Sequence, residues 1–214
     1  MQASKQLSIG FDVSARRQNT GFTFLDENTI YSAAVLSIPT IPAYVDGLPA
    51  RGRANNNPLA IVTSPAYDRT QFNLINGTIR YEYKVPRVKG LALDGFAAID
   101  YATSFRKRWQ QPHFFYEKDA NGNLQRIPNN TATSLTENFN QSNSYTLNTR
   151  LKFDRNFGVH GITSFVAVER NEIVTNSNSA ARTGFLSPQI DQLFAGAAAT
   201  QVNSGSCLLY TSPS

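Results

Sequence analysis

Apolar and polar residues alternate with a period of two in five separate stretches of the chain. The five stretches cover residues 7–16, 75–85, 91–106, 145–153 and 161–170. Successive side chains of a β-strand point to opposite faces, so each stretch predicts a strand with one apolar face and one polar face. No stretch has comparably strong helical periodicity. The pattern therefore predicts an all-β fold.

The alternation also predicts which side chains share a face of the sheet. It is cleanest in 75–85 and blurs in 161–170, where Phe165 and Val166 are adjacent apolar residues. The predicted apolar face includes Leu7, Ile9, Phe11, Ile79, Tyr81, Leu147 and Leu151. The predicted polar face includes Arg80, Glu82, Lys84, Asp94, Asp100, Asn148 and Arg150.

The connections between these stretches alternate between long and short. Two long connections contain the Pro- and Gly-rich residues 38–69 and the polar and aromatic residues 108–142, whereas the other two are short. Connections in compact soluble domains have a median of about 4 to 6 residues. Transmembrane β-barrels have short turns on one side and long extracellular loops on the other. We therefore expect an antiparallel up-and-down meander, a partial segment of a large transmembrane β-barrel with long extracellular loops.

The composition excludes several other classes of protein. The chain of 214 residues has 16% charged residues, one Cys and two His, so it has neither a disulfide framework nor a convincing zinc site. It contains no apolar run of about 18 residues, as a transmembrane helix requires. The formal charge is +5, but the Lys and Arg residues are scattered, so no nucleic-acid partner is expected.

No group of residues predicts catalysis or cofactor binding. Glu82, Asp94 and Asp100 share predicted polar faces, but a water-filled lumen also requires polar and charged side chains. Neither His113 nor His160 has a visible triad partner, and the chain lacks both a nucleophile elbow and a glycine-rich phosphate loop. We therefore expect a protein that is not an enzyme and that has no catalytic residues, metal or cofactor.

Aromatic residues near the predicted strand ends have two possible roles. Tyr81 and Tyr83 precede a short turn, while Phe105 and Trp109 flank a long loop. They fit either the two interfacial girdles of an outer-membrane barrel or ordinary sheet packing. In the same long loop, Trp109, Phe114 and Tyr116 are candidates for a ligand-stacking platform, with packing inside the loop as the alternative.

Four segments together resemble one family of proteins. They are NPLA at 57–60, leading into the strand LINGTIRYEY; KGLALDGFAAIDY at 89–101; SLTENFNQSNSYTLNTRLKFDRNFGVHGITSFVAVE at 134–169; and FLSPQIDQLFAG at 185–196. In order and spacing they resemble the barrel of SusC/RagA-type TonB-linked outer-membrane transporters of Bacteroidetes. The resemblance covers roughly residues 5 to 200.

The resemblance implies a location in the cell outer membrane and a role in nutrient uptake. A full-length member binds a SusD-like lipoprotein and TonB, is surrounded by outer-membrane lipid, and imports an oligosaccharide or peptide substrate. The plug, the TonB box, the signal peptide and the closing strand have no counterpart in the sequence, so we expect residues 1–206 to be a partial barrel segment. The alternative interpretation is a soluble β-sandwich that acts as a carbohydrate-binding module, in which Trp109 and Tyr116 stack on the sugar rings.

The last eight residues have a different expected origin. CLLYTSPS at 207–214 matches what the mosaic end of a sequencing-library transposon and its adapter encode in one reading frame. We therefore expect residues 207–214 to be adapter read-through at the end of a metagenomic gene fragment rather than native sequence.

Overall fold

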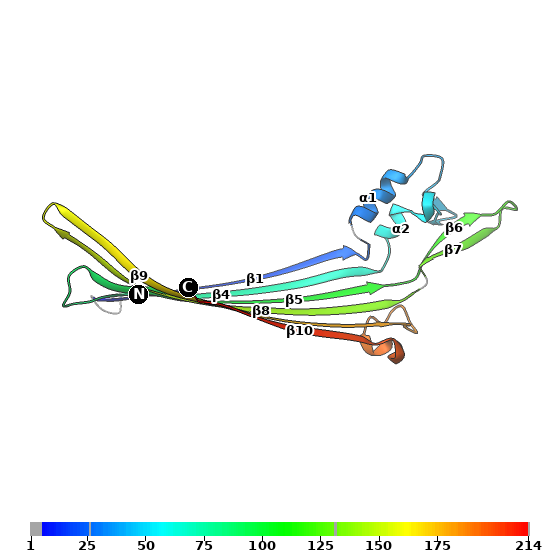
Figure 1. Cartoon of the computed structure of the whole chain (residues 1–214). Helices are drawn as coiled ribbons and strands as arrows, with labels where there is room; N and C mark the ends of the chain where they lie inside the picture. The colour runs from blue at the N-terminus through cyan, green and yellow to red at the C-terminus, as the bar shows by residue number, and fades with distance from the viewer. Residues whose placement is uncertain (1–5, 26, 131, 214) are drawn as a thin grey trace.

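Six long strands form one open antiparallel sheet (Figure 1). The computed structural model describes residues 6–25, 27–130 and 132–213. Each strand pairs with the next strand of this sheet along the chain, which confirms the predicted all-β, antiparallel up-and-down meander. In spatial order the strands are β1 (Leu7–Thr23), β4 (Tyr67–Lys84), β5 (Leu91–Gln110), β8 (Ser134–Phe157), β9 (His160–Thr183) and β10 (Val202–Pro213).

The strands extend well beyond the stretches that the alternation predicted. β8 and β9 have 24 residues each, and a turn of only two residues joins them in place of the predicted longer one. Gly158 has φ +61° at the first turn position, where the two-residue type II′ hairpin turn places glycine. The added parts of both strands carry Ser, Asn and Thr on both faces, so they give no periodic signal. Hydrogen bonding to the neighbouring strands decides their conformation.

The sixth strand, β10, was not predicted. Its residues pair in register with β9, from Val202 opposite Ala181 to Pro213 opposite Arg170. The strand includes Cys207–Pro213, so most of the expected adapter stretch lies on the edge of the sheet. Serine-rich sequence before Cys207 hides the alternation that would have indicated a strand.

The long connections lie together at one end of the sheet, opposite the two short turns (Figure 1). The connection after β1 contains α1 (Glu27–Leu36), β2 (Tyr44–Val45), β3 (Leu48–Pro49), η1 (Arg53–Asn55) and α2 (Pro58–Val62). The connection after β5 is the hairpin of β6 (His113–Lys118) and β7 (Leu124–Asn130). A third connection, after β9, contains η2 (Leu193–Ala195) and η3 (Ala198–Thr200). Much of the predicted loop 108–142 is therefore strand.

Local sequence signals explain how the first connection folds. The Asn57 side chain caps α2 by accepting from the backbone N–H of Leu59 at 3.0 Å, and Pro58 occupies the first helical position. The side-chain amide of Asn57 also donates to the backbone carbonyls of Ala43 and Ala50, at 2.9 and 2.8 Å. One buried asparagine thus links the helix to the turns that precede it.

The two faces of the sheet differ in character from β1 to β8. Directly paired residues of an antiparallel sheet share a face. Phe11, Ile79, Ala97 and Leu147 follow one another across the four strands and form one apolar row. The neighbouring row on the opposite face contains Gly10, Arg80, Phe96 and Asn148. We call these faces the apolar face and the polar face.

The separation of apolar and polar side chains onto opposite faces ends at β9. Arg170 and Glu172 lie on the apolar face, opposite Leu147 and Tyr145, and form an ion pair of 2.8 Å with each other. Phe165, opposite Lys152, lies on the polar face. The blurred alternation in the sequence of this strand therefore corresponds to a mixed surface in the structure.

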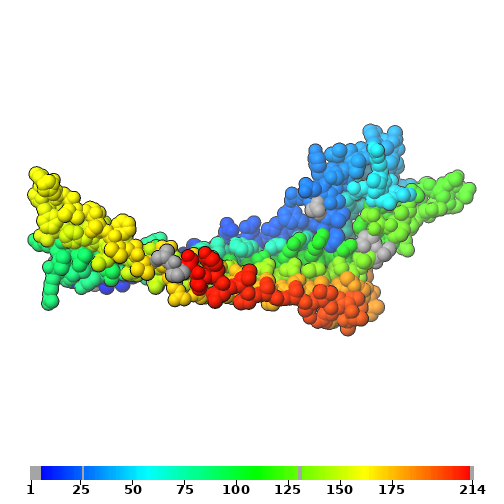
Figure 2. Space-filling view, viewed as in Figure 1, coloured from blue at the N-terminus to red at the C-terminus, as the bar shows by residue number. Residues whose placement is uncertain are grey.

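Little of the molecule is buried. Figure 2 shows a thin, elongated body with the connections gathered at one end. The central apolar side chains are open on their face: Phe11 and Val13 are each 74% exposed and Ile79 is 56% exposed. The small core lies instead near the connections, where Trp109, Leu135 and Phe185 pack together. The long middle section of the sheet has no second layer among the described residues.

Candidate functional site

The polar face carries a hollow of about 560 Å³ near the end with the short turns. Five of the seven predicted polar-face residues line it: Arg80, Glu82, Asp94, Asn148 and Arg150. The strand register accounts for this grouping, because Glu82 is opposite Asp94 and Asp94 is opposite Arg150. Three neighbouring strands thus bring side chains that are far apart in sequence into one site.

The charges in this hollow are compensated by pairing between neighbouring strands. The Arg150 guanidinium donates to both carboxylate oxygens of Asp94, through Nε at 3.0 Å and through a second nitrogen. Arg80 pairs with Asp12 of β1. Such pairs at a solvent-exposed face contribute little stability but fix the positions of the charged groups.

Of the two remaining polar-face candidates, Lys84 lies beside this hollow and Asp100 lies further along β5. Lys84 pairs with Glu82 at 3.8 Å on the same strand, and Asn148 donates to the Glu169 carboxylate at 2.8 Å. Asp100 accepts from the Asn76 amide at 2.5 Å. The register places all seven candidates on one face of the sheet, where each could contact a polar solute.

A second hollow, of about 400 Å³, lies further along the same face toward the connections. Its lining contains hydroxyl and amide side chains and one arginine: Thr70, Ser104, Arg106, Asn138, Asn140, Ser177, Asn178, Ser179, Ser204 and Ser206. Arg106 is held by the Asp68 carboxylate, its Nε donating at 2.8 Å. The polar face thus changes from charged to mostly neutral along its length. The sequence patterns gave no sign of this second hollow, because Asn and Ser there occupy both faces.

The aromatic residues proposed as a stacking platform are not brought together. Trp109 is 1% exposed and packs edge-to-face on Phe185, with ring centroids 4.7 Å apart. Its buried ring offers no face to a ligand. Trp109 therefore has the alternative role of packing, and its proposed roles in ligand stacking and in an exposed girdle are wrong. Phe114 and Tyr116 are half-buried on β6, and Phe114 lies beneath the Arg126 guanidinium. Only these two remain accessible, within the hairpin.

Tyr116 instead helps to join two connections. Its backbone carbonyl accepts from the Arg51 N–H at 2.9 Å, and the Arg51 guanidinium pairs with Glu117 at 3.2 Å. Phe115, on the other face of β6, is completely buried. Packing within the long loops therefore explains these aromatic residues.

The connection at residues 184–201, which we call the strap, was not identified as functional from its sequence. It folds back onto the apolar face, where Phe185 covers Trp109 and Leu193 packs beside them. The Phe185 N–H donates to Thr133 Oγ1 at 2.9 Å. The available signal was the group of large apolar residues in this segment: Phe185, Leu186, Ile190, Leu193 and Phe194.

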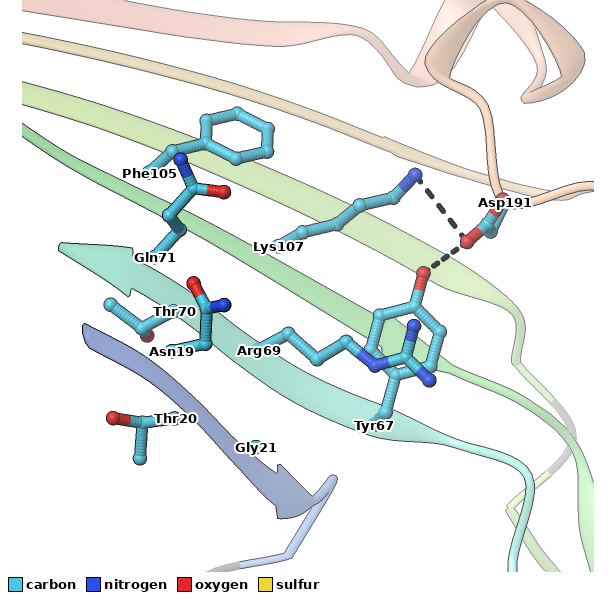
Figure 3. Close-up of a pocket in the computed structure, with 10 residues that line it drawn as sticks. All are labelled: Asn19, Thr20, Gly21, Tyr67, Arg69, Thr70, Gln71, Phe105, Lys107 and Asp191. Carbon is cyan, nitrogen blue, oxygen red and sulfur yellow. Dashed lines mark hydrogen bonds and ion pairs between the residues drawn. The ribbon is translucent and has the colours of Figure 1, made fainter. Parts of the chain in front are cut away.

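The strap closes one side of a hollow of about 470 Å³ on the apolar face (Figure 3). Asp191 of the strap accepts from the Tyr67 hydroxyl and pairs with Lys107 at 3.4 Å. Burial tends to raise the pKa of Asp191, but the Tyr67 hydrogen bond and the Lys107 ammonium outweigh it and hold the pKa below its usual value. The carboxylate therefore stays ionised and fastens the strap to β4 and β5.

Together, the fold and these hollows define an all-β protein whose single large sheet exposes a charged and amide-rich face opposite an apolar one. No protein family and no curated protein matches the chain in sequence. The described residues contain no group of three or more His, Cys, Asp or Glu side chains that could hold a metal ion. None of the described helices is long and apolar enough to cross a membrane.

Proposed function

We propose that the chain is a wall segment of a SusC/RagA-type TonB-dependent importer of the cell outer membrane. In this proposal the apolar face contacts outer-membrane lipid and the polar face lines the lumen through which an oligosaccharide or peptide passes. The role is transport rather than catalysis. The observation that carries the proposal is the exposure of apolar side chains on one face and of charged and amide side chains on the other, along strands without a covering layer.

The height of the apolar band agrees with a membrane. On β5 the band runs from Leu91 through Leu93, Ala97 and Ile99 to Tyr101. A rise of about 3.3 Å per residue gives about 33 Å along the strand, or about 25 Å along the barrel axis for a strand tilt of about 40°. Outer-membrane barrels have an apolar band of about 25 Å. Beyond Tyr101 this face of β5 becomes mixed, with Thr103, Phe105 and Lys107.

The energy of apolar exposure also favours lipid as the neighbour. Moving a large apolar side chain from water into an apolar environment is favourable by about 1.5 to 3 kcal/mol. The exposed residues of this face include Phe11, Val13, Ile75, Ile79, Ile99, Leu147 and Leu151. A contiguous surface of this kind on a water-soluble monomer would promote association. The β-sandwich alternative requires a second sheet over this face, and the other two sheets of the described residues have two strands each.

The partners follow from the same proposal. A sheet with β1 and β10 at its two edges requires further strands to close a barrel, and the full-length protein would supply them together with the plug. The three connections at one end would face outside, where a SusD-like lipoprotein binds. TonB would act from the opposite side through the plug.

Spin labels on adjacent residues test the proposal. Ile79→Cys and Arg80→Cys place a label on the apolar and the polar face of β4, in a Cys207→Ser background that removes the single cysteine of the sequence. Leu147→Cys and Asn148→Cys provide a matched pair on β8. In outer membranes from cells producing the full-length protein, labels at 79 and 147 should collide mainly with oxygen, which concentrates in lipid. Labels at 80 and 148 should collide mainly with a water-soluble nickel chelate. Equal accessibility within each pair would refute the proposal.

A further inference from the structure

The apolar face carries a cationic and aromatic site just beyond the apolar band. It is the hollow of Figure 3, formed by β1, β4, β5 and the strap. In its central row Gly21 is opposite Arg69, and Arg69 is opposite Lys107. The next row toward the band contains Asn19, Gln71 and Phe105. Aromatic, cationic and amide groups therefore meet where the apolar surface ends.

Two arginine side chains near this site have no carboxylate partner. Arg69 is exposed, and its guanidinium lies 4.1 Å from the centroid of the Tyr67 ring. Arg17, one row closer to the band than Gln71, donates to the Gln71 side-chain oxygen at 2.9 Å. Neither forms an ion pair within residues 6–25, 27–130 and 132–213. Each keeps donors that an anion could use.

The acidic groups of the site are already paired. Lys107 lies between Asp191 and Glu137, at 3.4 and 3.6 Å, and Tyr67 donates to Asp191. With Arg17 and Arg69, the five ionised side chains carry three positive and two negative charges. The unpaired positive charge is therefore concentrated on the arginines, on the side of the hollow facing β1.

We propose that this hollow binds the phosphate of a phosphorylated lipid in the outer leaflet, an inference that rests on the proposed function. Arg69 binds the phosphate oxygens, Arg17 and the amides of Asn19 and Gln71 hydrogen-bond the rest of the headgroup, and the acyl chains follow the apolar band past Phe105. The site is on the face opposite the two polar-face hollows, so a solute in the lumen would not reach it. Arg69 lies one row, or about 5 Å along the barrel axis, beyond Phe105.

The space for the headgroup depends on Gly21. A Cβ atom at this position would have no atom within 4 Å, so β1 leaves room above the backbone where Arg69 and Lys107 project. A leucine here would extend into that space without changing any charge. Gly10 has the same open surroundings but lies on the polar face, so it offers a matched control.

Binding of a chain-labelled phosphatidic acid tests this inference. The full chain in a neutral maltoside detergent is titrated with the fluorescent lipid, and anisotropy gives the affinity. Unlabelled phosphatidic acid, phosphatidylcholine and inorganic phosphate are competitors. Phosphatidic acid should displace the probe at concentrations at least tenfold below those required for phosphatidylcholine. Displacement by inorganic phosphate at the concentrations effective for phosphatidic acid would overturn the lipid assignment and indicate a site for free phosphate.

Variants on the two faces locate the bound lipid. Arg69→Gln should weaken binding about five- to tenfold, the expected loss of a charge-assisted hydrogen bond. Gly21→Leu should weaken it by a similar factor, because the leucine side chain occupies the space of the headgroup. Arg80→Gln and Gly10→Leu should leave it unchanged, while far-UV circular dichroism verifies that each variant keeps the sheet. Unchanged binding in both Arg69→Gln and Gly21→Leu would refute this inference alone. Loss in Arg80→Gln instead would mean that the polar face meets lipid, and would refute the proposed function.

Discussion

The strap can be tested through the chain's single tryptophan. Trp109 is 1% exposed because Phe185 of the strap covers its ring, with centroids 4.7 Å apart at an interplanar angle of 83°. Phe185→Ala removes that cover. The adjacent Leu186 is fully exposed, so Leu186→Ala is a control that alters the same segment without touching the core.

The magnitude follows from the burial of Phe185. Loss of a buried aromatic side chain costs about 2 to 3 kcal/mol of apolar burial, and loss of an edge-to-face pair adds about 1 kcal/mol. If the strap opens locally, a reduction of about 3 kcal/mol in its closing free energy raises the open population about a hundredfold, since about 1.4 kcal/mol corresponds to a factor of ten. The six-stranded sheet itself should persist, because the change is confined to one end.

Acrylamide quenching measures the opening. Phe185→Ala should increase the quenching constant of Trp109 and shift its emission to longer wavelength, while Leu186→Ala should match the unmodified chain. Far-UV circular dichroism reports whether the sheet remains. Equal quenching in Phe185→Ala and the unmodified chain, with the sheet intact, would show that the strap does not protect Trp109.

Three further predictions concern close contacts and pH. Gly95→Ala should lower the free energy of unfolding in urea by about 1 to 3 kcal/mol, because its Cβ would lie 2.2 Å from the Asn148 carbonyl and 2.8 Å from the Tyr81 hydroxyl; Gly77→Ala, with open space around it, should change it little. Burial lowers the pKa of His113 below 6.5, so the unfolded hairpin binds more protons and stability falls as the pH drops through 6.5. Amide exchange in residues 113–130, corrected for intrinsic rates, should therefore be faster at pH 5.5 than at pH 7.5, and pH-independent protection would contradict this. The pKa of Asp191 is lowered from 3.8, so the carboxylate stabilises the strap above pH 3.8, and this stabilisation is lost as the pH falls through the folded-state pKa. Quenching of Trp109 should therefore rise on acidification. The rise should be smaller in Asp191→Asn, which lacks the titrating group.

The strand order and much of the face assignment could be predicted from the sequence. From β1 to β8, one side of the sheet is apolar and the other polar, so the period-two signal is strong wherever the strands cross the apolar band. Beyond the band both faces carry polar residues, and the signal disappears although the strands continue. The ends of β8 and β9 were missed for this reason.

Contacts between distant segments could not be predicted from local patterns. The sequence pattern predicts that Trp109 is an exposed aromatic residue of a loop. In the structure Phe185, 76 positions later in the sequence, packs over its ring. The hollow of Figure 3 likewise depends on Asp191 reaching Tyr67 and Lys107. Alternation identifies the strand on which each residue lies, but it contains no information on where the strap folds back.

The contrast in connection length sets the order in which the sheet can form. β8 and β9 are joined by two residues, whereas residues 24–66 separate β1 from β4. Closing the longer connection costs about 2.7 kcal/mol more chain entropy, taking (3/2)RT ln n for each loop. We therefore expect the β8–β9 hairpin to form early, pairing outward from Gly158, and β4 to pair independently with β5 across their short turn. β1 pairs with β4 across the connection that is the most costly to close, so we expect it to be the last of these strands to join the sheet.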